Sequence, residues 1–399
     1  AAWAGTQIEE ARRRKTAAGA TYNQTLDERA SPLQLDLERH TFPGIELVDR
    51  YTFRILLDRP YPQILYWMAM PFFSPVPEEA EAFYAQGALA ERNLSLARYP
   101  VGTGPFRIER LDKNRVIVLT RNPSYRDERY PSEGEPGDKA LGLLARAGEK
   151  LPLADRVVFT LEKEAIPAWQ KFLQGYYDNS GIGADSFERA VSLSPEGSLG
   201  LSPEMERKGI QLSRRVTAST TYFGFNMDDK VVGGYEKAGC KLRQAIAVAI
   251  DTEERIQIFL NGRGIPAASP IPPGIFGFEE GREGINPLTH DWDPVLMAPR
   301  RKPLEEAKRL LAEAGFPGGI GPDGKQLTIG FDNSWFQSES QPILVWMRGQ
   351  LARIGVNLEI RTTDYNRFQE KIHSGNYQMF PWGWNADYPD PENFLFLLY

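Results

Sequence analysis

The sequence has one cysteine, Cys240, and three histidines among its 399 residues. A single cysteine excludes an intramolecular disulfide and a cysteine-rich metal site. His40, His290 and His373 lie far apart in the chain and none belongs to an H-E-x-x-H motif, so the pattern does not indicate a histidine-based zinc site. We therefore expect no metal site and no cofactor.

Long apolar runs and a surplus of positive charge are missing too. No stretch approaches the roughly 18 apolar residues that span a bilayer. The net charge of −6 argues against a nucleic-acid partner, because such a surface concentrates positive charge. The one basic run, EEARRRK, places Glu9 and Glu10 four residues before Arg13 and Arg14, which is the spacing of a solvated, self-paired helix face.

The two ends of the chain look cut. It begins with Ala rather than Met and stops on the apolar segment FLFLLY. We therefore expect a fragment that lacks both ends of a longer protein. A hydrophobic content of 41% with 25% charged residues is ordinary for a soluble globular protein, and 399 residues suggest two or more lobes.

The first half of the chain is rich in hairpin patterns. The segment IELVDRYTFRILLDRP, residues 45–60, predicts two strands about a polar break. The segment GTGPFRIERLDKNRVIVLTRNPSY, residues 102–125, predicts a hairpin that turns at LDKN. The Pro- and Gly-rich residues 130–142 that follow predict a surface loop.

After Cys240 the pattern changes to helices alternating with short strands. Asp251 caps one predicted helix, with Glu254 at the capping-box position. Pro303 and Gly315 mark the start and the end of another helix. The expected strands are QLTIGF, VNLEIRT and YQMFPWGW, separated by helical patterns over 341–354 and 364–374. This alternation predicts an α/β lobe over roughly 226–399.

Signatures of common catalytic sites are missing. No G-x-S-x-G motif occurs, so a hydrolase triad has no nucleophile signature. The segment GIGPDGKQ, residues 319–326, fits G-x-x-x-x-G-K but carries Gln326 where a P-loop needs Ser or Thr for magnesium. A helix precedes this segment and a strand follows it, which is the reverse of a P-loop, so we interpret it as a turn.

The segment FPWGWNADYPDPENFLF, residues 380–396, combines aromatics with carboxylates and contains no cation. In a strand, Trp382 and Trp384 share one face and leave Gly383 and Asn385 on the other. Asp387 follows this strand. A carboxylate at the end of an aromatic strand suits a ligand that carries one positive charge and apolar groups, because a charge beside tryptophans needs a partner.

Other functions for the carboxylates of this segment remain open. Asp387 and Asp390 match the acid/base pair of a carbohydrate-active enzyme. With Glu392 they match a calcium site. For Asp390 we favour a structural role, in which Asp390 and Asn393 are capping groups of a Pro-punctuated turn.

Seven blocks of the sequence, in order, resemble the extracytoplasmic solute-binding proteins of ABC importers, in the oligopeptide/dipeptide class known as family 5. The resemblance covers about residues 42–399. The blocks are VDRYTFRILLDRPYP (48–62), YPVGTGPFRIERLDKNRVIVLTRNPSY (99–125), ADRVVFTLEKEAIPAWQKFLQGYYD (154–178), TYFGFNM (221–227), KLRQAIAVAIDTEERIQIFLNGRGIPAASPIPPG (241–274), KPLEEAKRLLAEAGFP (302–317) and GWNADYPDPENFL (383–395).

The resemblance implies an α/β fold of the periplasmic-binding-protein type II class, in its large three-domain form. Such proteins have two lobes with a hinge and a cleft, plus a small extra domain. By this likeness residues 1–101 are the remainder of the extra domain inserted in lobe I, and residues 102–225 are the middle part of lobe I. Residues 226–399 are lobe II, incomplete at its C-terminus.

The resemblance also implies a binding site. In peptide-binding relatives the strand that matches WGWNAD, which holds Trp382, Gly383, Trp384 and Asn385, pairs its backbone with an extended ligand. The aspartate that matches Asp387 pairs with the ligand's α-ammonium, in a charge-assisted hydrogen bond of roughly 1.5–3 kcal/mol. Tyr222 lies in TYFGFN, which is expected to be one of the strands that link the lobes at the hinge.

The implied protein is a periplasmic or otherwise extracytoplasmic receptor rather than an enzyme. It would bind a peptide or a small amine-bearing solute and deliver it to the permease subunits of an ABC transporter, as a monomer when full length. A binder of a non-peptide solute, such as a sugar, an opine or a metal chelate, is the alternative within the family, because the fold does not fix the ligand.

Overall fold

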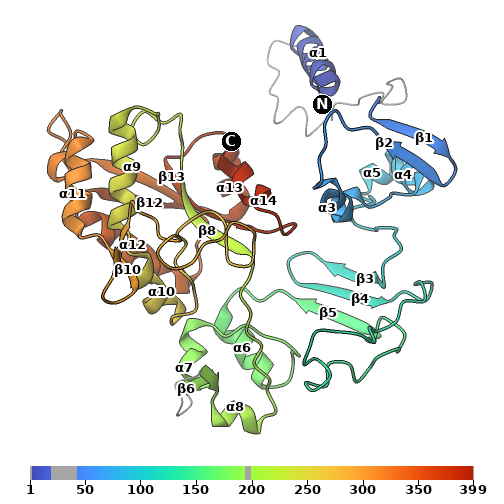
Figure 1. Ribbon diagram of the computed structural model, residues 1–399. Helices are drawn as coiled ribbons and strands as arrows, with labels where there is room; N and C mark the ends of the chain where they lie inside the picture. Colours follow the sequence, from blue (N-terminus) through green and yellow to red (C-terminus); the bar gives the residue numbers. More distant parts are fainter. Residues whose placement is uncertain (1, 19–42, 194–198, 399) are drawn as a thin grey trace. The chain divides into compact units, whose positions relative to one another are not determined.

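The computed structural model describes residues 2–18, 43–193 and 199–398 (Figure 1). The chain forms two compact units, residues 1–69 and residues 70–399. His40 lies outside the described residues, as does part of the predicted extra domain. None of the helices in the described ranges has both the length and the apolar composition needed to cross a bilayer.

The described residues of the first unit, 2–18 and 43–69, form the helices α1 Ala2–Ala18 and α3 Ile64–Ala69 and a hairpin of β1 Ile45–Asp49 and β2 Thr52–Ile55. On α1, Arg13 lies 3.5 Å from Glu9 and Arg14 lies 3.9 Å from Glu10, with all four side chains exposed. This confirms the predicted self-paired helix face. The predicted strand pair is confirmed as well, since β1 and β2 are antiparallel.

The second unit begins with short helices and a sheet of three antiparallel strands in the order β3-β4-β5. The predicted hairpin is confirmed, and Asn114 in its turn adopts a left-handed φ of 62°. Residues 130–142 form turns and irregular backbone, as predicted. The elements are η1 Pro71–Phe73, α4 Glu78–Tyr84, α5 Gly87–Glu91, β3 Phe106–Asp112, β4 Val116–Arg121 and β5 Arg156–Thr160.

A small cluster of elements with its own core follows. Trp169, Ala190, Val191 and Met205 are buried together. The elements that carry them are α6 Ala165–Leu173, η2 Ala184–Ser186, α7 Phe187–Ala190, the hairpin of β6 Val191–Leu193 and β7 Leu199–Leu201, and α8 Pro203–Arg207.

The rest of the unit is built on a four-stranded sheet in the order β12-β11-β13-β8. β11 is parallel to β12 and to β13, whereas β8 is antiparallel to β13. The chain passes from β11 through α12 to β12, and then through α13 to β13 on the other side of β11. Because these three strands are parallel, their carboxyl ends share one edge of the sheet. The sheet consists of β8 Ser219–Phe225, β11 Thr328–Asn333, β12 Asn357–Thr362 and β13 Met379–Asn385.

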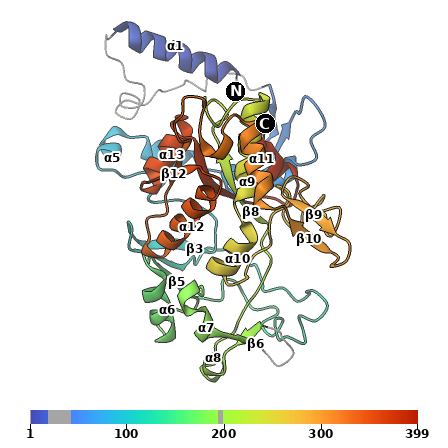
Figure 2. The same ribbon diagram turned by 90° about the vertical axis from the view of Figure 1, so that its left-hand side faces the viewer.

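Helices flank this sheet, with α9 and α11 side by side (Figures 1 and 2). The predicted cap is confirmed, because the Asp251 side chain accepts a hydrogen bond of 2.9 Å from the Glu254 backbone N–H. The elements are α9 Lys237–Ala249, α10 Thr252–Leu260, β9 His290–Asp293, β10 Ala298–Arg301, α11 Leu304–Glu313, η3 Pro317–Gly319, η4 Ser338–Ser340, α12 Gln341–Ala352, α13 Tyr365–His373, α14 Glu392–Leu395 and η5 Phe396–Leu398.

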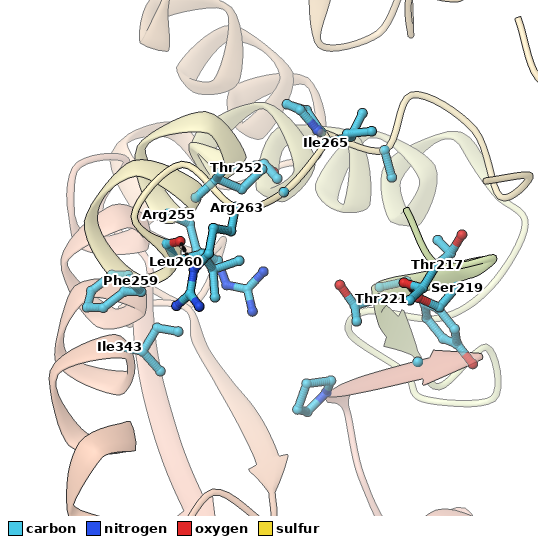
Figure 3. Close-up of a pocket in the computed structure, with 18 of the residues that line it drawn as sticks. Thr217, Ser219, Thr221, Thr252, Arg255, Phe259, Leu260, Arg263, Ile265 and Ile343 are labelled. Carbon is cyan, nitrogen blue, oxygen red and sulfur yellow. Dashed lines mark hydrogen bonds between the residues drawn. The ribbon is translucent and has the colours of Figure 1, made fainter. Parts of the chain in front are cut away.

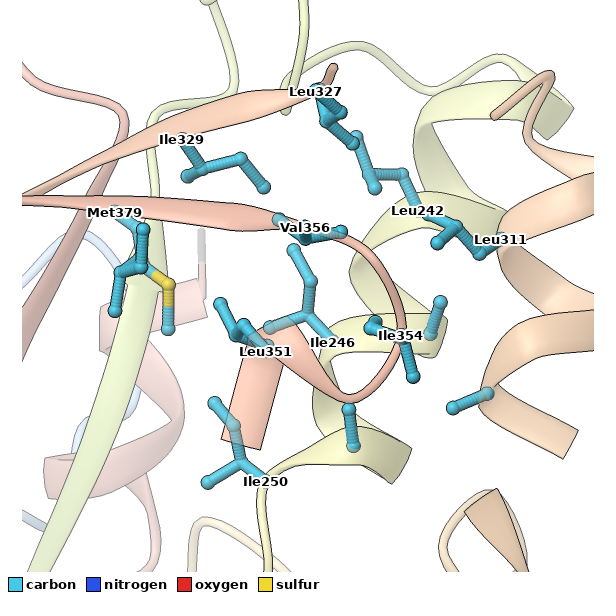
Figure 4. Close-up of a cluster of buried hydrophobic side chains, with 14 of the residues drawn as sticks. Leu242, Ile246, Ile250, Leu311, Leu327, Ile329, Leu351, Ile354, Val356 and Met379 are labelled. Carbon is cyan, nitrogen blue, oxygen red and sulfur yellow. The ribbon is translucent and has the colours of Figure 1, made fainter. Parts of the chain in front are cut away.

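The main hydrophobic core lies between the sheet and these helices (Figure 4). Leu242 and Ile246 of α9 meet Leu311 of α11, and the strands add Ile329 and Met379. The amphipathic pattern predicted for α9 is therefore the pattern that buries it. Because a close-packed core holds its strands rigidly, it fixes the position of β13, on which the predicted site depends.

Candidate functional site

Among the described residues, the strand that carries the predicted site has a full-length neighbouring strand on one side only. β8 pairs with β13 along its whole length, from Met379 to Asn385. On the other side β11 pairs with β13 at Met379 alone. Past Met379, therefore, β13 has an open edge in the described part of the chain.

The backbone at this edge points outward. Just beyond the strand, the Ala386 N–H donates a hydrogen bond of 2.8 Å to the Ala218 carbonyl. Antiparallel residues alternate between bonded and non-bonded pairs, so the even-numbered residues of β13 bond to β8. The N–H and C=O groups of Gly383 and Asn385 thus point away from β8. No hydrogen bond from the described residues reaches them at the open edge, which leaves them available to an added strand.

An aromatic wall lies on one face of β13. The Trp382 ring stacks on Phe368 of α13 at a centroid distance of 5.2 Å and lies 6.3 Å from Tyr365. Phe380 meets Trp382 edge to face at 6.2 Å. Tyr222 of β8 is the cross-strand partner of Trp382. Such a wall offers large apolar contact area that adapts to many ligands.

Asn393 joins Trp384 to Asp387. Its amide oxygen accepts hydrogen bonds from the Trp384 indole N–H at 2.9 Å and from the Asp387 backbone N–H at 2.8 Å. Its amide nitrogen lies 3.5 Å from an Asp387 carboxylate oxygen. Asn393 is only 3% exposed, whereas Asp387 is exposed. A buried amide therefore orients both the indole and the backbone that presents the carboxylate.

Asp390 has the structural role that the sequence favours for it. Its carboxylate accepts a hydrogen bond of 2.9 Å from the Glu392 backbone N–H and closes the turn before α14. Among the described residues no group of three or more His, Cys, Asp or Glu side chains is placed to hold a metal ion. Asp387, Asp390 and Glu392 are thus not grouped as ligands of one ion.

A large cleft borders this strand, with a volume of about 3750 Å³. Pockets for single small ligands enclose roughly 300–1,000 Å³, so the cleft has room for an extended ligand. Figure 3 shows one part of it, where Thr217, Ser219 and Thr221 face α10 and the loop after it. The cleft lining contains more arginines than carboxylates.

Tyr222 and Arg255 both line the cleft, and burial shifts the pKa of each. Desolvation raises the pKa of the Tyr222 phenol above its ordinary value, so this hydroxyl is protonated at neutral pH. No hydrogen bond to it occurs within the described residues. Desolvation also lowers the pKa of the Arg255 guanidinium, and no carboxylate of the described residues offsets the shift. Both side chains are thus partly buried and polar, and neither has a partner in the described part of the chain.

The structure brings together four of the six predicted site residues. Tyr222, Trp382, Gly383 and Trp384 all line the cleft. Asn385 and Asp387 follow directly in the chain but are solvent-exposed and do not belong to the cleft lining. The link between Asp387 and the aromatic strand is the side chain of Asn393.

Two residues of the site, Asn393 and Arg255, do not stand out in the sequence as binding residues. Asn393 appeared only as a capping group, although its place nine residues after Trp384 in an aromatic segment is a weak signal of an indole acceptor. Arg255 did not stand out at all, because it is one of many charged residues on an amphipathic helix. Only the three-dimensional arrangement shows that it lines the cleft and that no acidic side chain in the described ranges pairs with it.

A family model described as "Bacterial extracellular solute-binding proteins, family 5 Middle" matches residues 6–399. Among curated proteins, the dipeptide-binding protein of Escherichia coli K12 is 23% identical over 363 residues, which is 89% of this chain and 55% of that protein. Di/tripeptide-binding protein 4 of Pseudomonas aeruginosa is 27% identical over 362 residues, 88% of this chain and 55% of that protein. The chain thus spans about half the length of these relatives.

Solved structures show the same likeness. The periplasmic binding protein DppA of Helicobacter pylori, in complex with the peptide STSA, superposes with a TM-score of 0.61 at 22% identity, over 89% of this chain and 56% of that one. The dipeptide-binding protein of Pseudoalteromonas sp. SM9913, in complex with Met-Leu, gives 0.61 at 23% identity, over 88% and 57%. The predicted fold class, α/β of the periplasmic-binding-protein type, is confirmed.

Proposed function

Because the chain belongs to the family 5 bacterial extracellular solute-binding proteins, we propose that it forms part of the ligand cleft of a peptide receptor. The receptor captures peptides or similar amine-bearing solutes outside the cytoplasm and delivers them to the membrane permease of an ABC importer. Its role is binding rather than catalysis. The family match disfavours the carbohydrate-active enzyme, and the engagement of Asp390 with the turn before α14 argues against its use as a catalytic acid.

The open edge of β13 carries this proposal. An extended peptide added at this edge pairs its backbone with Gly383 and Asn385, and such pairing does not depend on the ligand's side chains. Trp382, Trp384 and Tyr222 provide apolar surface beside the added strand. A receptor for peptides of varied sequence needs this combination of backbone bonds and adaptable walls.

Asp387 is proposed to bind the ligand's α-ammonium. It lies two residues past Asn385, so it follows the last outward-facing backbone group of the edge. Asn393 holds its backbone in place, and no ion pair involves its carboxylate in the described part of the chain. A ligand ammonium at this point would fix the register of the added strand.

We also propose the domain division inferred from the resemblance, with boundaries near 101 and 225. The buried members of the main core span Val232 to Met379, and the small core spans Trp169 to Met205. Separate cores on the two sides of 225 support a boundary there. β8 itself, residues 219–225, is bonded to β13, so the proposed hinge strand is anchored in the second lobe's sheet.

The identity of the ligand is tested first by mass spectrometry of material co-purified with the full-length protein. A series of peptides supports the proposal, whereas a sugar, an opine or a metal chelate refutes the peptide assignment. The amine site is tested by titration calorimetry of wild type and Asp387→Ala with a bound peptide and its N-acetylated form.

We expect Asp387→Ala to weaken binding of the free peptide by roughly 10- to 100-fold, from a charge-assisted hydrogen bond of about 1.5–3 kcal/mol. Acetylation should weaken wild-type binding by a similar factor and change the variant little. Asp390→Asn is the matched control, because it alters a carboxylate of the same turn. This variant should discriminate between the free and the N-acetylated peptide as wild type does. Equal discrimination by wild type and Asp387→Ala would show that Asp387 is not the amine site.

A further inference from the structure

Arg263 connects two parts of the cleft lining that belong to separate cores. It lies in the loop that follows α10 and lines the cleft. One of its guanidinium nitrogens, Nη1, donates a hydrogen bond of 2.8 Å to the Ile182 carbonyl. The guanidinium also lies over the Phe187 ring, 4.7 Å from its centroid. Ile182 and Phe187 both pack against the small core around Trp169, so this one side chain reaches across to the other side of the cleft.

The helix before this loop is fixed to the main core. Phe259 of α10 meets Trp346 of α12 edge to face, with ring centroids 5.8 Å apart, and Trp346 packs against the main core. Glu254 of α10 accepts hydrogen bonds from the Trp346 indole at 2.8 Å and from the Gln350 amide at 2.7 Å. A contact made by the residue just after α10 therefore restrains the main-core side of the cleft as a whole.

The turn at the end of α10 places the Arg263 side chain. Asn261 and Gly262 have left-handed φ values of 49° and 72° and end the helix. The Arg263 backbone N–H and its side-chain Nε both donate to the Leu260 carbonyl, at 2.9 Å and 3.0 Å (Figure 3). Carbonyl groups at a helix C-terminus attract a cation. The guanidinium is thus held at the end of its own helix while Nη1 bonds to Ile182.

Two further hydrogen bonds join the same two sides. The Asn261 side-chain amide donates to the Ala184 carbonyl at 3.4 Å. The Ser338 hydroxyl of η4 donates to the carboxylate of Glu164, which precedes α6, at 3.3 Å. Both bonds are exposed and longer than an ordinary hydrogen bond, so each is weak. Arg263 combines a shorter bond with a ring contact and is therefore the strongest of these three connections.

We propose that Arg263 is a positioning residue of the cleft, which holds the two sides together through Ile182 and Phe187 without contacting the ligand. A ligand enclosed between the sides leaves only when they part, so the contact slows its release. Because parting is the same step for every ligand, this effect does not depend on the ligand's sequence. The inference rests on the proposed peptide-receptor function and names the residue that sets how long a ligand stays bound.

The rate of peptide release measures this contact. Full-length wild type and Arg263→Gln are loaded with radiolabelled alanine peptides of two to five residues and chased with an excess of the same unlabelled peptide. An exposed hydrogen bond and a cation–π contact each change an equilibrium by a factor of a few. We therefore expect Arg263→Gln to release every peptide about 5- to 20-fold faster than wild type, by the same factor for each peptide.

Three further variants separate the proposed contact from other effects of the substitution. Arg263→Lys keeps the charge near Phe187 but not the planar fork, so its release rate should be intermediate. Arg367→Gln makes the same change in net charge at an exposed arginine outside the cleft lining, and should release peptide as wild type does. Phe187→Leu keeps an apolar contact with the small core but removes the aromatic face, and should also speed release.

Phe187→Leu and Arg263→Gln together complete a double-mutant cycle. If Arg263 acts through the Phe187 ring, Phe187→Leu should speed release much less in Arg263→Gln than in wild type, because the contact is already lost. Effects of the two substitutions that simply multiply would overturn the inference.

Small-angle X-ray scattering of the ligand-free proteins tests the contact without any ligand. We expect a larger radius of gyration for Arg263→Gln than for wild type and Arg367→Gln, because the two sides part more often. Equal radii overturn the inference whatever the ligand is. Unchanged release by Arg263→Gln, or a change that differs widely among the peptides, overturns it too, while the peptide-receptor function stands. Wild type that binds none of the peptides refutes the proposed function, and the scattering comparison then decides the inference alone.

Discussion

Asn393 allows a quantitative test of how the site is held together. Its amide oxygen is the acceptor for both the Trp384 indole N–H and the Asp387 backbone N–H. Asn393→Ala removes that acceptor and leaves two donors without a partner. Asp387 is exposed, so its N–H turns to water at little cost, but Trp384 is only partly accessible.

The expected loss of stability therefore comes mainly from the indole. A donor left unsatisfied away from water costs about 1–3 kcal/mol. We expect Asn393→Ala to reduce the free energy of unfolding by about 2 kcal/mol, measured by urea denaturation with circular dichroism. The same variant should weaken discrimination between free and N-acetylated peptide, because the backbone that presents Asp387 loses its anchor.

Asn357→Ala is the matched control for this experiment. Asn357 is an exposed asparagine that donates a hydrogen bond of 3.1 Å to the Thr328 hydroxyl. A surface bond of this kind is readily replaced by water, so its loss should change the free energy of unfolding by less than about 0.5 kcal/mol. If Asn393→Ala and Asn357→Ala have equal free energies of unfolding and discriminate equally between free and N-acetylated peptide, Asn393 does not organise the site.

Two further predictions concern the scaffold. Gly355→Ala should unfold at a markedly lower urea concentration than wild type, because Gly355 has a φ of +84° and a Cβ there would collide with the Gly318 backbone. Gly349→Ala, in open space within α12, should instead raise the free energy of unfolding by about 0.5–1 kcal/mol. Equal urea midpoints for the two variants would contradict the close approach of the Gly355 and Gly318 backbones. The Leu296 and Val295 backbone N–H groups lower the pKa of Asp293, so its stabilising effect is complete above the ordinary carboxyl pKa, about 3.9, and is lost as pH falls below it. The urea midpoint of Asp293→Asn should therefore differ less between pH 6 and pH 3 than the urea midpoint of wild type does. A difference as large as that of wild type would argue against this role of Asp293.

Local sequence signals predicted the fold well where a local interaction determines the structure. The cap of α10 depends on Asp251 and Glu254, three residues apart, and both behave as the capping pattern predicts. The strand at 379–385 follows from its alternation and its flanking turns. Order along the chain does not determine how strands pair, and β8 joins β13 across more than a hundred residues.

The candidate site was less accessible to sequence reasoning, and Arg255 shows why. Asp251 lies four residues before Arg255, a spacing that by itself favours an ion pair on one helix face. In the structure Asp251 is used as the cap of α10 and lies 3.9 Å from Arg301 instead. A residue's lack of a partner is a property of all its neighbours together, and no short motif encodes it.

Three features of the cleft are unfavourable for the protein alone. Within residues 2–18, 43–193 and 199–398, the edge of β13 presents unpaired backbone groups at Gly383 and Asn385. In the same ranges the partly desolvated Tyr222 hydroxyl has no hydrogen-bond partner, and Arg255 has no counterion. Each costs folding free energy that a better-satisfied sequence would recover. A peptide would satisfy the edge with its backbone and Asp387 with its amine. The groups that destabilise the protein alone are thus complementary to one class of ligand. This is the physical reason to regard them as a binding site.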